Sequence, residues 1–451
     1  AVSINTPALS NGSVFKVDSS LDQAWTDEGW GVKNFLVRDL ASSYSGNATF
    51  KVNGGAGNVS VSGAMGAGKS LKDVVLNSTA NTTLGGAVTA STVATDAGGL
   101  LQLNGSTLTT TGAQSFGENM ALGSDVTLSA SSISAAGAIN LGAYRMTLNT
   151  NADVSLGGVI SGVGGAITQQ GTGALTLSGA NSYTGGTTVS SGKVVAAVDS
   201  VGNITSGAFG TGTVTVASGA TIDLNGKSVA NALNISGTGV GGAGVLINSS
   251  ATAATVSGAV TVAANSTLGG AGAMTLSGAV GAGSYTVSFV NAPSFTATNT
   301  GNSIQNIAIT NSALTLKTNQ SLTVAASSLS GATTLQTVAA DKDITISGAI
   351  TNTANANSLT LMAARNIFFN SSVTGALGKS LNVLAYSDTD NTSGGAIQFG
   401  SFISSFGGNV TLGGGTSDAT SACATAFSCT AGYASYASGV TNGAGIYLKI
   451  G

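Results

Sequence analysis

Short apolar runs alternate with Gly, Asn and Ser along almost the whole chain. Two such runs, Ala174–Leu177 and Thr188–Val194, flank a segment rich in Gly, Asn and Ser. This is the pattern of short β-strands joined by tight turns. A third run, Thr213–Gly226, repeats the design. Each unit is too short to bury an apolar face by itself, so it needs a similar unit above and below it, as in a solenoid.

The density of turn signals fits either a stacked solenoid or an antiparallel sandwich. Two observations favour the solenoid. Aromatic residues, which fill a sandwich core, make up only 5% of the chain. In addition, one phrase returns in altered form at 83–89, 155–161 and 256–262. We therefore predict an all-β fold, a three-sided parallel β-helix with roughly 20 residues per turn and about 20 rungs, in the shape of a rod.

The pattern divides the chain into three parts. Residues 1–50 hold both Trp residues and a local concentration of charge, which predicts an N-terminal cap or irregular first rungs. Trp25 and Trp30 are alternatively a contact surface for sugars or partners. Residues 51–290 are expected to form solenoid with a distinct repeat at 171–226, and residues 291–451 to continue it with longer, bulkier phrases.

Composition separates this chain from several protein classes. Charged residues are 7% and His is absent, yet apolar residues are 42%, which argues against disorder. Pro occurs twice among 67 Gly, which excludes collagen. A net charge of −3 without any basic run predicts no nucleic-acid partner. No apolar run reaches the ~18 residues of a membrane span, so we expect no membrane insertion.

The two ends and the two cysteines bear on processing. The start, Ala1–Pro7, has no basic region followed by an apolar core, and the end, Ile446–Gly451, looks like an uncapped strand. Both features favour a processed product or a piece of a longer protein. Cys423 and Cys429 lie in one Ser/Ala/Thr-rich loop. Their even number and short separation predict a disulfide in an oxidising compartment rather than a metal site.

Motifs for nucleotide or metal chemistry occur without their usual context. Gly63–Ser70 has Walker A spacing, but the next residues return to strand and turn rather than starting a helix. The Gly-x-Gly-x-x-Gly match at Gly237–Gly242 carries still less weight. Asp is not periodic, as calcium-binding nonapeptide repeats require. The pairs Asp341/Asp343 and Asp388/Asp390 are interpreted as solvated turns rather than metal sites. We expect no cofactor and no metal.

Two other functions, an enzymatic one and ice binding, are remote alternatives to a structural role. Polysaccharide-active β-helix enzymes gather titratable groups in a groove, and this chain has few to gather, so we predict no enzymatic activity. Ice binding needs Thr to recur outward on one face of every rung. Thr109–Thr111 and Thr187–Thr188 suggest such a face, but the spacing of the phrases is too irregular for the sequence to establish it.

The stretch from Gly171 to Val194 resembles the passenger-associated repeat of bacterial autotransporters. The matching residues are Leu175, Leu177, Gly179, Asn181, Tyr183, Gly185, Gly186, Thr187 and Gly192. The segments 358–369, 394–400 and 407–413 resemble repeats of filamentous-haemagglutinin-like exoproteins. Both families are secreted, right-handed parallel β-helices, so the resemblance implies that fold and an extracellular or cell-surface location. The chain shows neither a secretion-domain motif at its start nor a membrane barrel at its end, which leaves the export route open.

The resemblance implies a secreted adhesive or structural rod, a segment of a large adhesin. Its partners would be host or neighbouring-cell surfaces, glycans, or other copies of itself. The alternative is a self-assembling extracellular filament or matrix subunit that polymerises through its solenoid ends. Asn181, Tyr183 and Gly185 are expected to be turn and packing residues. Specific contacts are expected near Trp25 and Trp30 or around the Cys423–Cys429 loop.

Overall fold

The computed structural model describes residues 49–201, 204–390 and 395–414, together with the backbone of three short outlying strands. The chain divides into two compact units, Ala1–Thr215 and Val216–Gly451. The described residues form strands and turns, with one short 3-10 helix, η1, Val240–Gly242. They make about 16 turns of parallel β-solenoid. The predicted all-β solenoid is confirmed and its rung count is close.

Unit 1 is built from strands of two to eight residues. They are β1 Phe15–Val17, β2 Phe50–Gly55, β3 Val59–Val61, β4 Leu71–Ser78, β5 Asn81–Leu84, β6 Val88–Thr95, β7 Leu100–Leu103, β8 Thr107–Thr110, β9 Ala113–Phe116, β10 Asn119–Leu122, β11 Val126–Ser129, β12 Ser132–Ala135, β13 Ile139–Asn140, β14 Arg145–Asn149, β15 Val154–Leu156, β16 Ile160–Ser161, β17 Ala166–Gln169, β18 Ala174–Leu177, β19 Thr187–Val189 and β20 Lys193–Ala196. Strand β21, Val214–Val216, lies at the division between the units.

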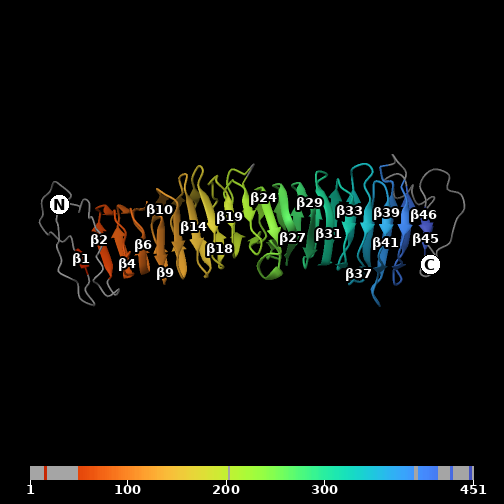
Figure 1. The fold of residues 1–451 in the computed structure, drawn as a ribbon, viewed down its shortest axis with the longest axis horizontal. Helices are drawn as coiled ribbons and strands as arrows, with labels where there is room; N and C mark the ends of the chain where they lie inside the picture. The colour runs from red at the N-terminus through yellow and green to blue at the C-terminus, as the bar shows by residue number, and fades with distance from the viewer. Residues whose placement is uncertain are drawn as a thin grey trace. The chain divides into compact units, whose positions relative to one another are not determined.

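Strands of unit 1 pair with strands one turn away, and every pairing between them is parallel. One sheet has the order β16-β13-β10-β7-β5-β3. In it Leu101, Met120 and Ile139 occupy equivalent positions on successive turns, 19 residues apart. A second series runs β8-β11-β14-β17-β19 and a third β9-β12-β15-β18-β20. Figure 1 shows β2, β4 and β6, which pair in the same parallel way, side by side.

Unit 2 has longer strands and one continuous sheet of its own. Its strands are β22 Thr221–Asp223, β23 Ser228–Val229, β24 Leu233–Gly237, β25 Leu246–Asn248, β26 Ala254–Val256, β27 Val260–Gly270, β28 Met274–Leu276, β29 Val280–Val290, β30 Phe295–Ala297, β31 Ser303–Ser312, β32 Leu314–Thr318, β33 Leu322–Val324, β34 Ser327–Leu329, β35 Thr333–Thr337, β36 Ile344–Ile346, β37 Ile350–Asn352, β38 Asn357–Met362, β39 Ile367–Phe369, β40 Val373–Thr374, β41 Leu381–Ser387, β42 Ile397–Phe399, β43 Ile403–Ser404, β44 Val410–Gly414, β45 Phe427–Cys429 and β46 Ile446–Leu448.

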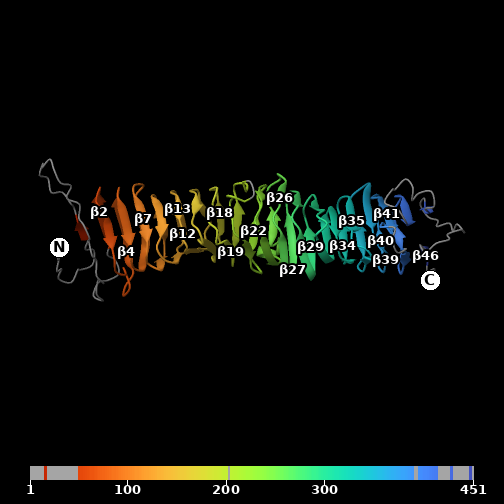
Figure 2. The same cartoon turned by 90° about the horizontal axis from the view of Figure 1, so that it is seen from above.

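The ten-stranded sheet of unit 2 has the order β23-β26-β28-β30-β32-β35-β38-β41-β44-β45. Its pairings are parallel except β44–β45, which is antiparallel. Figure 2 shows β26, β35 and β41 of this sheet on one side of the unit. A ladder of buried aliphatic side chains lines its inner face: Leu316, Leu335, Leu361 and Ala385 stand in register. Stacking of apolar side chains from turn to turn supplies the main stabilisation of a solenoid.

The domain boundaries predicted at residues 50 and 290 stay predictions. The chain divides into its two compact units between Thr215 and Val216. Strand β29, which ends at Val290, pairs in parallel with β31 through Val290 and Thr310. The turn-to-turn pairing of unit 2 therefore continues past residue 290.

Candidate functional site

Three polar residues of the 171–194 stretch, Asn181, Tyr183 and Thr187, are buried inside unit 1. The Tyr183 side chain is 0% exposed, and its hydroxyl oxygen lies 2.6 Å from Thr187 Oγ1. Thr187 Oγ1 lies 3.2 Å from the carbonyl oxygen of Phe209, to which it donates. Burial raises the pKa of Tyr183 well above its ordinary value, with the Thr187 hydroxyl opposing the shift. The phenol is therefore a neutral, buried packing group.

Asn181 ties three backbone segments together. Its Oδ1 accepts from Ile160 N at 2.8 Å, and its Nδ2 donates to Ala208 O at 2.7 Å. Its own backbone exchanges two 3.0 Å hydrogen bonds with Gly207. At a corner of the coil, some backbone groups have no neighbouring strand to bond to. The buried Asn181 amide satisfies two of them, because its oxygen accepts from a backbone N–H and its nitrogen donates to a backbone carbonyl.

Two glycines of the same stretch allow neighbouring turns to approach closely. Gly186 has φ +89°, and a Cβ there would lie 2.4 Å from the carbonyl oxygen of Thr213. At Gly185 a Cβ would lie 2.4 Å from the carbonyl oxygen of Gly164. Leu175 and Leu177, in β18, are fully buried. The matched residues thus shape the turns and fill the interior of this part of the coil.

The outer face of unit 1 carries a column of hydroxyl groups. Thr127 pairs with Thr107 and Thr147, Thr147 with Thr168, and Thr168 with Thr188. All five side chains are exposed or half-buried, while residues on either side of them in the strands are buried. Neighbouring strands lie ~4.8 Å apart, so the column repeats at that interval.

The ten-stranded sheet of unit 2 bears a longer column. Six Thr occupy one outward position on six successive strands: Thr255, Thr275, Thr296, Thr315, Thr334 and Thr360. Each is half-buried. Ser228 precedes the column and Leu384 follows it. The sequence alone does not reveal this surface, because the interval between successive Thr varies from 19 to 26 residues. The detectable signal is a single Thr between two inward residues, as in Met274–Leu276.

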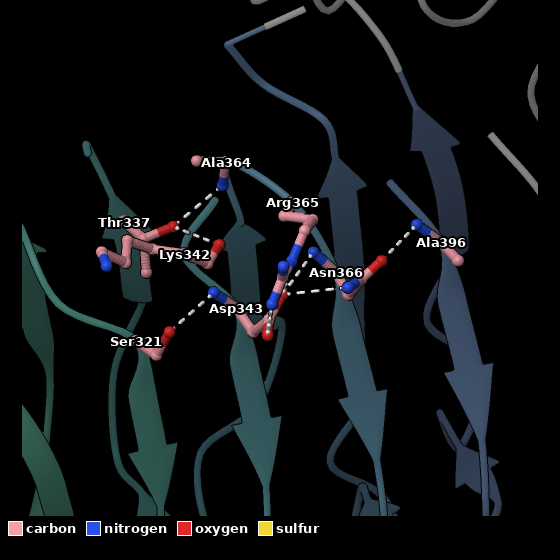
Figure 3. Close-up of polar contacts among 8 residues, drawn as sticks. All are labelled: Ser321, Thr337, Lys342, Asp343, Ala364, Arg365, Asn366 and Ala396. Atoms are coloured by element: carbon pink, nitrogen blue, oxygen red, sulfur yellow. Dashed lines mark hydrogen bonds and ion pairs between the residues drawn. The ribbon is translucent and has the colours of Figure 1, made fainter. Parts of the chain in front are cut away.

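One charged cluster projects from unit 2. Arg365 forms a bidentate ion pair with Asp343, in which Nε donates to Oδ1 at 2.9 Å and Nη2 donates to Oδ2 at 2.7 Å. Asn366 donates both its backbone N and its Nδ2 to Asp343 Oδ1 at 3.0 Å. Figure 3 shows these groups on adjacent strands, with the backbone N–H of Asp343 donating to Ser321 Oγ at 3.1 Å.

The electrostatics of this cluster favour the ionised carboxylate. Burial acts to raise the pKa of Asp343, but hydrogen bonds from Arg365 and the Asn366 backbone, with the charge of Arg365, outweigh it and lower the pKa. The interpretation of Asp343 as a solvated turn residue is therefore wrong. Its side chain is 17% exposed and forms an ion pair with Arg365 on the next turn. Asp343 therefore links two neighbouring turns of the solenoid.

Residues 167–196 match the passenger-associated-transport-repeat. This segment contains all nine residues on which the sequence resemblance was based. Together with the parallel solenoid, the match fits an autotransporter passenger. Comparison with curated proteins and with solved structures gave no match.

The nucleotide-like motifs belong to the scaffold that surrounds the passenger-associated repeat. Gly63–Ser70 is followed by strand β4, which pairs in parallel with β2 and β6. A P-loop requires a helix at that point. Gly237–Gly242 runs from the end of β24 into η1, whose three residues are too short to present a helix terminus. Both segments are turns of the coil.

Several predicted residues lie outside the part of the chain that the structure describes. These are Trp25, Trp30 and Cys423, and the side chain of Cys429, whose backbone belongs to β45. The aromatic contact surface and the disulfide stay predictions. Within the described ranges, no three His, Cys, Asp or Glu side chains gather into a metal-binding group. No described helix has the length and apolar character needed to cross a membrane.

Proposed function

We propose that this chain is a segment of a secreted bacterial cell-surface protein, and that it acts as a structural and adhesive element rather than as an enzyme. The observation that supports the proposal is the passenger-associated repeat at 167–196, whose strands belong to two successive turns of a parallel solenoid. Passengers of this kind are exported to the cell surface, where a repetitive coil displays the same outward chemistry many times.

The contact surface that the geometry favours is the hydroxyl column of unit 2. Six Thr in register offer donors and acceptors at a regular interval without charge. Hydroxyl-rich partners, such as glycans on host or neighbouring cells, have complementary hydrogen-bonding groups. A repeated array turns many weak hydrogen bonds into avidity.

Binding of the purified chain to a glycan array and to intact cells tests this proposal. The double variant Thr275→Lys, Thr296→Lys, at two paired positions of the column, should lose at least tenfold in apparent affinity. The matched control places lysines at outward Thr323 and Thr345 on another sheet of the same unit, where they pair with each other. Equal binding by both variants would show that the hydroxyl column is not the contact surface. Deletion of residues 17–40 tests the alternative contact around Trp25 and Trp30.

The location and assembly have their own tests. Antibody labelling of intact producing cells should be positive if the protein is displayed on the surface. Electron microscopy of the purified chain distinguishes adhesion from the alternative of a self-assembling filament or matrix subunit. Long filaments with a regular subunit repeat would favour the alternative, and dispersed particles would favour the adhesive segment.

The threonine column of unit 2 also favours ice binding as a second candidate. The requirement set by the sequence, an outward Thr on successive rungs, is met over six strands. Thermal hysteresis and ice recrystallisation measure this activity directly. A chain that leaves ice growth unchanged at micromolar concentration would exclude it.

A further inference from the structure

A buried carboxyl group lies at a corner of unit 1. Glu118 lies between β9 and β10 and is 2% exposed. Neither of its carboxyl oxygens makes a hydrogen bond of normal distance and angle, although the Thr95 hydroxyl is close enough to favour the ionised form. Because an unpartnered buried carboxylate is strongly unfavourable, a native structure needs a way to neutralise it.

A second carboxylate occupies the same corner on the preceding turn. Strands β6 and β9 pair through Val93 with Gln114 and Ala94 with Ser115, and Asp96 follows β6 as Gly117 follows β9. The two backbones touch there, since a Cβ on Gly117 would lie 2.5 Å from the carbonyl oxygen of Asp96. Asp96 Oδ1 is also buried without a hydrogen-bond partner.

The electrostatic surroundings of Glu118 contain no compensating base. Burial raises the pKa of Glu118 to about 7, the Thr95 hydroxyl opposes the shift, and the charge of Asp96 adds to it. Among the described residues, no cation contributes to the shift of this pKa. Once Glu118 is ionised, above about pH 7, it lies beside a second acid with a buried oxygen and has no described cation to balance it.

We propose that Asp96 and Glu118 form a binding site for a hard divalent cation, and that Ca²⁺ is the ion that fits it best. Carboxylate oxygens are preferred ligands of Ca²⁺, which accepts irregular coordination, whereas Mg²⁺ requires a near-ideal octahedron and retains its water. Two carboxylates supply up to four oxygens, and carbonyl oxygens or water complete the shell. Glu118 forms the buried end, and half-buried Asp96 forms the rim through which the ion enters.

The competing explanation is a proton held between the two carboxyl groups. The two explanations predict different effects of pH and of calcium on the stability of the chain. A proton-neutralised pair is stabilised by acid and is indifferent to calcium. A cation site is stabilised by calcium at a pH above 7, where the carboxyl groups are ionised.

The test is thermal unfolding of the full chain at pH 8, after treatment with EDTA and during titration with CaCl₂ or MgCl₂. Wild type should show a saturable rise in Tm with Ca²⁺, smaller with Mg²⁺. Glu118→Gln, which preserves the shape of the side chain, should lose that rise, and Asp96→Asn should lose most of it. Asp125→Asn is the control, because exposed Asp125 undergoes the same change of charge in the same unit.

Isothermal titration calorimetry measures binding independently of stability. Wild type should bind one Ca²⁺ more per chain than Glu118→Gln. Equal calcium responses of Tm and equal stoichiometry in the two proteins would overturn the proposal. It would also be overturned if wild type ignored calcium at pH 8 but gained stability at pH 6 relative to Glu118→Gln, since a proton then neutralises the pair. These readouts do not depend on the adhesive function.

Discussion

Buried amide and hydroxyl side chains hold the corners of this coil by bonding to backbone groups of neighbouring turns. In unit 2, Asn302 Nδ2 donates to the carbonyl oxygens of Ala297 and Lys317, while its Oδ1 accepts from Val280 N at 2.8 Å. Asn181 does the same in unit 1. Burying such a side chain without hydrogen-bond partners lowers the stability of the fold, whereas burying it with every polar atom paired stabilises the fold.

Removing one hydroxyl from this network has a predictable cost. Tyr183→Phe keeps the ring in place but deletes the hydrogen bond to Thr187, so it should destabilise unit 1 by about 1 kcal/mol. Urea unfolding followed by circular dichroism measures the change. Tyr144→Phe is the control because Tyr144 is 38% exposed, and it should shift stability by less than about 0.5 kcal/mol. Equal effects of the two variants would contradict the role assigned to Tyr183.

The Glu118 carboxyl group predicts a pH dependence of stability. Its pKa is raised from 4.5 to about 7 in the folded chain, so the protonated form stabilises the fold. This contribution is full below about pH 4.5 and is lost as the pH rises through about 7, with a magnitude on the order of 3 kcal/mol at most. In EDTA, the free energy of unfolding of wild type relative to Glu118→Gln should fall between pH 5 and pH 8. A pH-independent difference would contradict the prediction.

At the scale of the strand, sequence alternation sets which side chains form ladders. In β11 and β14, Leu128 and Leu148 point inward in register while Thr127 and Thr147 point outward. Inward and outward ladders are therefore consequences of the same two-residue period. The turns between strands must then bring backbones together, which makes glycine necessary at specific points.

Gly186 and Gly157 test this requirement within one unit. Gly186→Ala places a methyl group against the Thr213 carbonyl at φ +89°, so it should destabilise unit 1 by about 2 kcal/mol or more. Gly157→Ala meets nothing within 4 Å and should be within about 0.5 kcal/mol of wild type. Thermal unfolding compares them. Similar losses from both substitutions would show that backbone entropy, rather than close approach, governs these turns.

For the whole molecule, the scarcity of charge limits the forces that can act on partners. The chain has 14 basic and 17 acidic residues among 451, and its hydroxyl columns carry no charge. Adhesion through these columns would therefore depend on hydrogen bonds and packing rather than on long-range attraction.

Salt provides the corresponding measurement. Binding to a glycan surface should change less than about twofold between 0.05 and 0.5 M NaCl, because exposed charges are the interactions that salt screens. The binding of an adhesin that relies on charged groups would fall steeply over the same range of NaCl concentration. A drop of tenfold or more would assign binding to charged groups and contradict the role of the Thr columns. The experiment is to be performed without divalent cations, which could act through Asp96 and Glu118.

The amino-acid sequence by itself determined the fold class and the repeat. The two-residue alternation and the Gly-Asn turns are local signals, and residues such as Leu175 and Tyr183 carry a recognisable motif. Only the tertiary structure decided the register, because turns of unequal length align strands whose sequence spacing differs. Register places Thr255 to Thr360 in one column, joins Arg365 to Asp343, and brings Glu118 beside Asp96. These contacts join residues about 20 apart, and no local pattern encodes them.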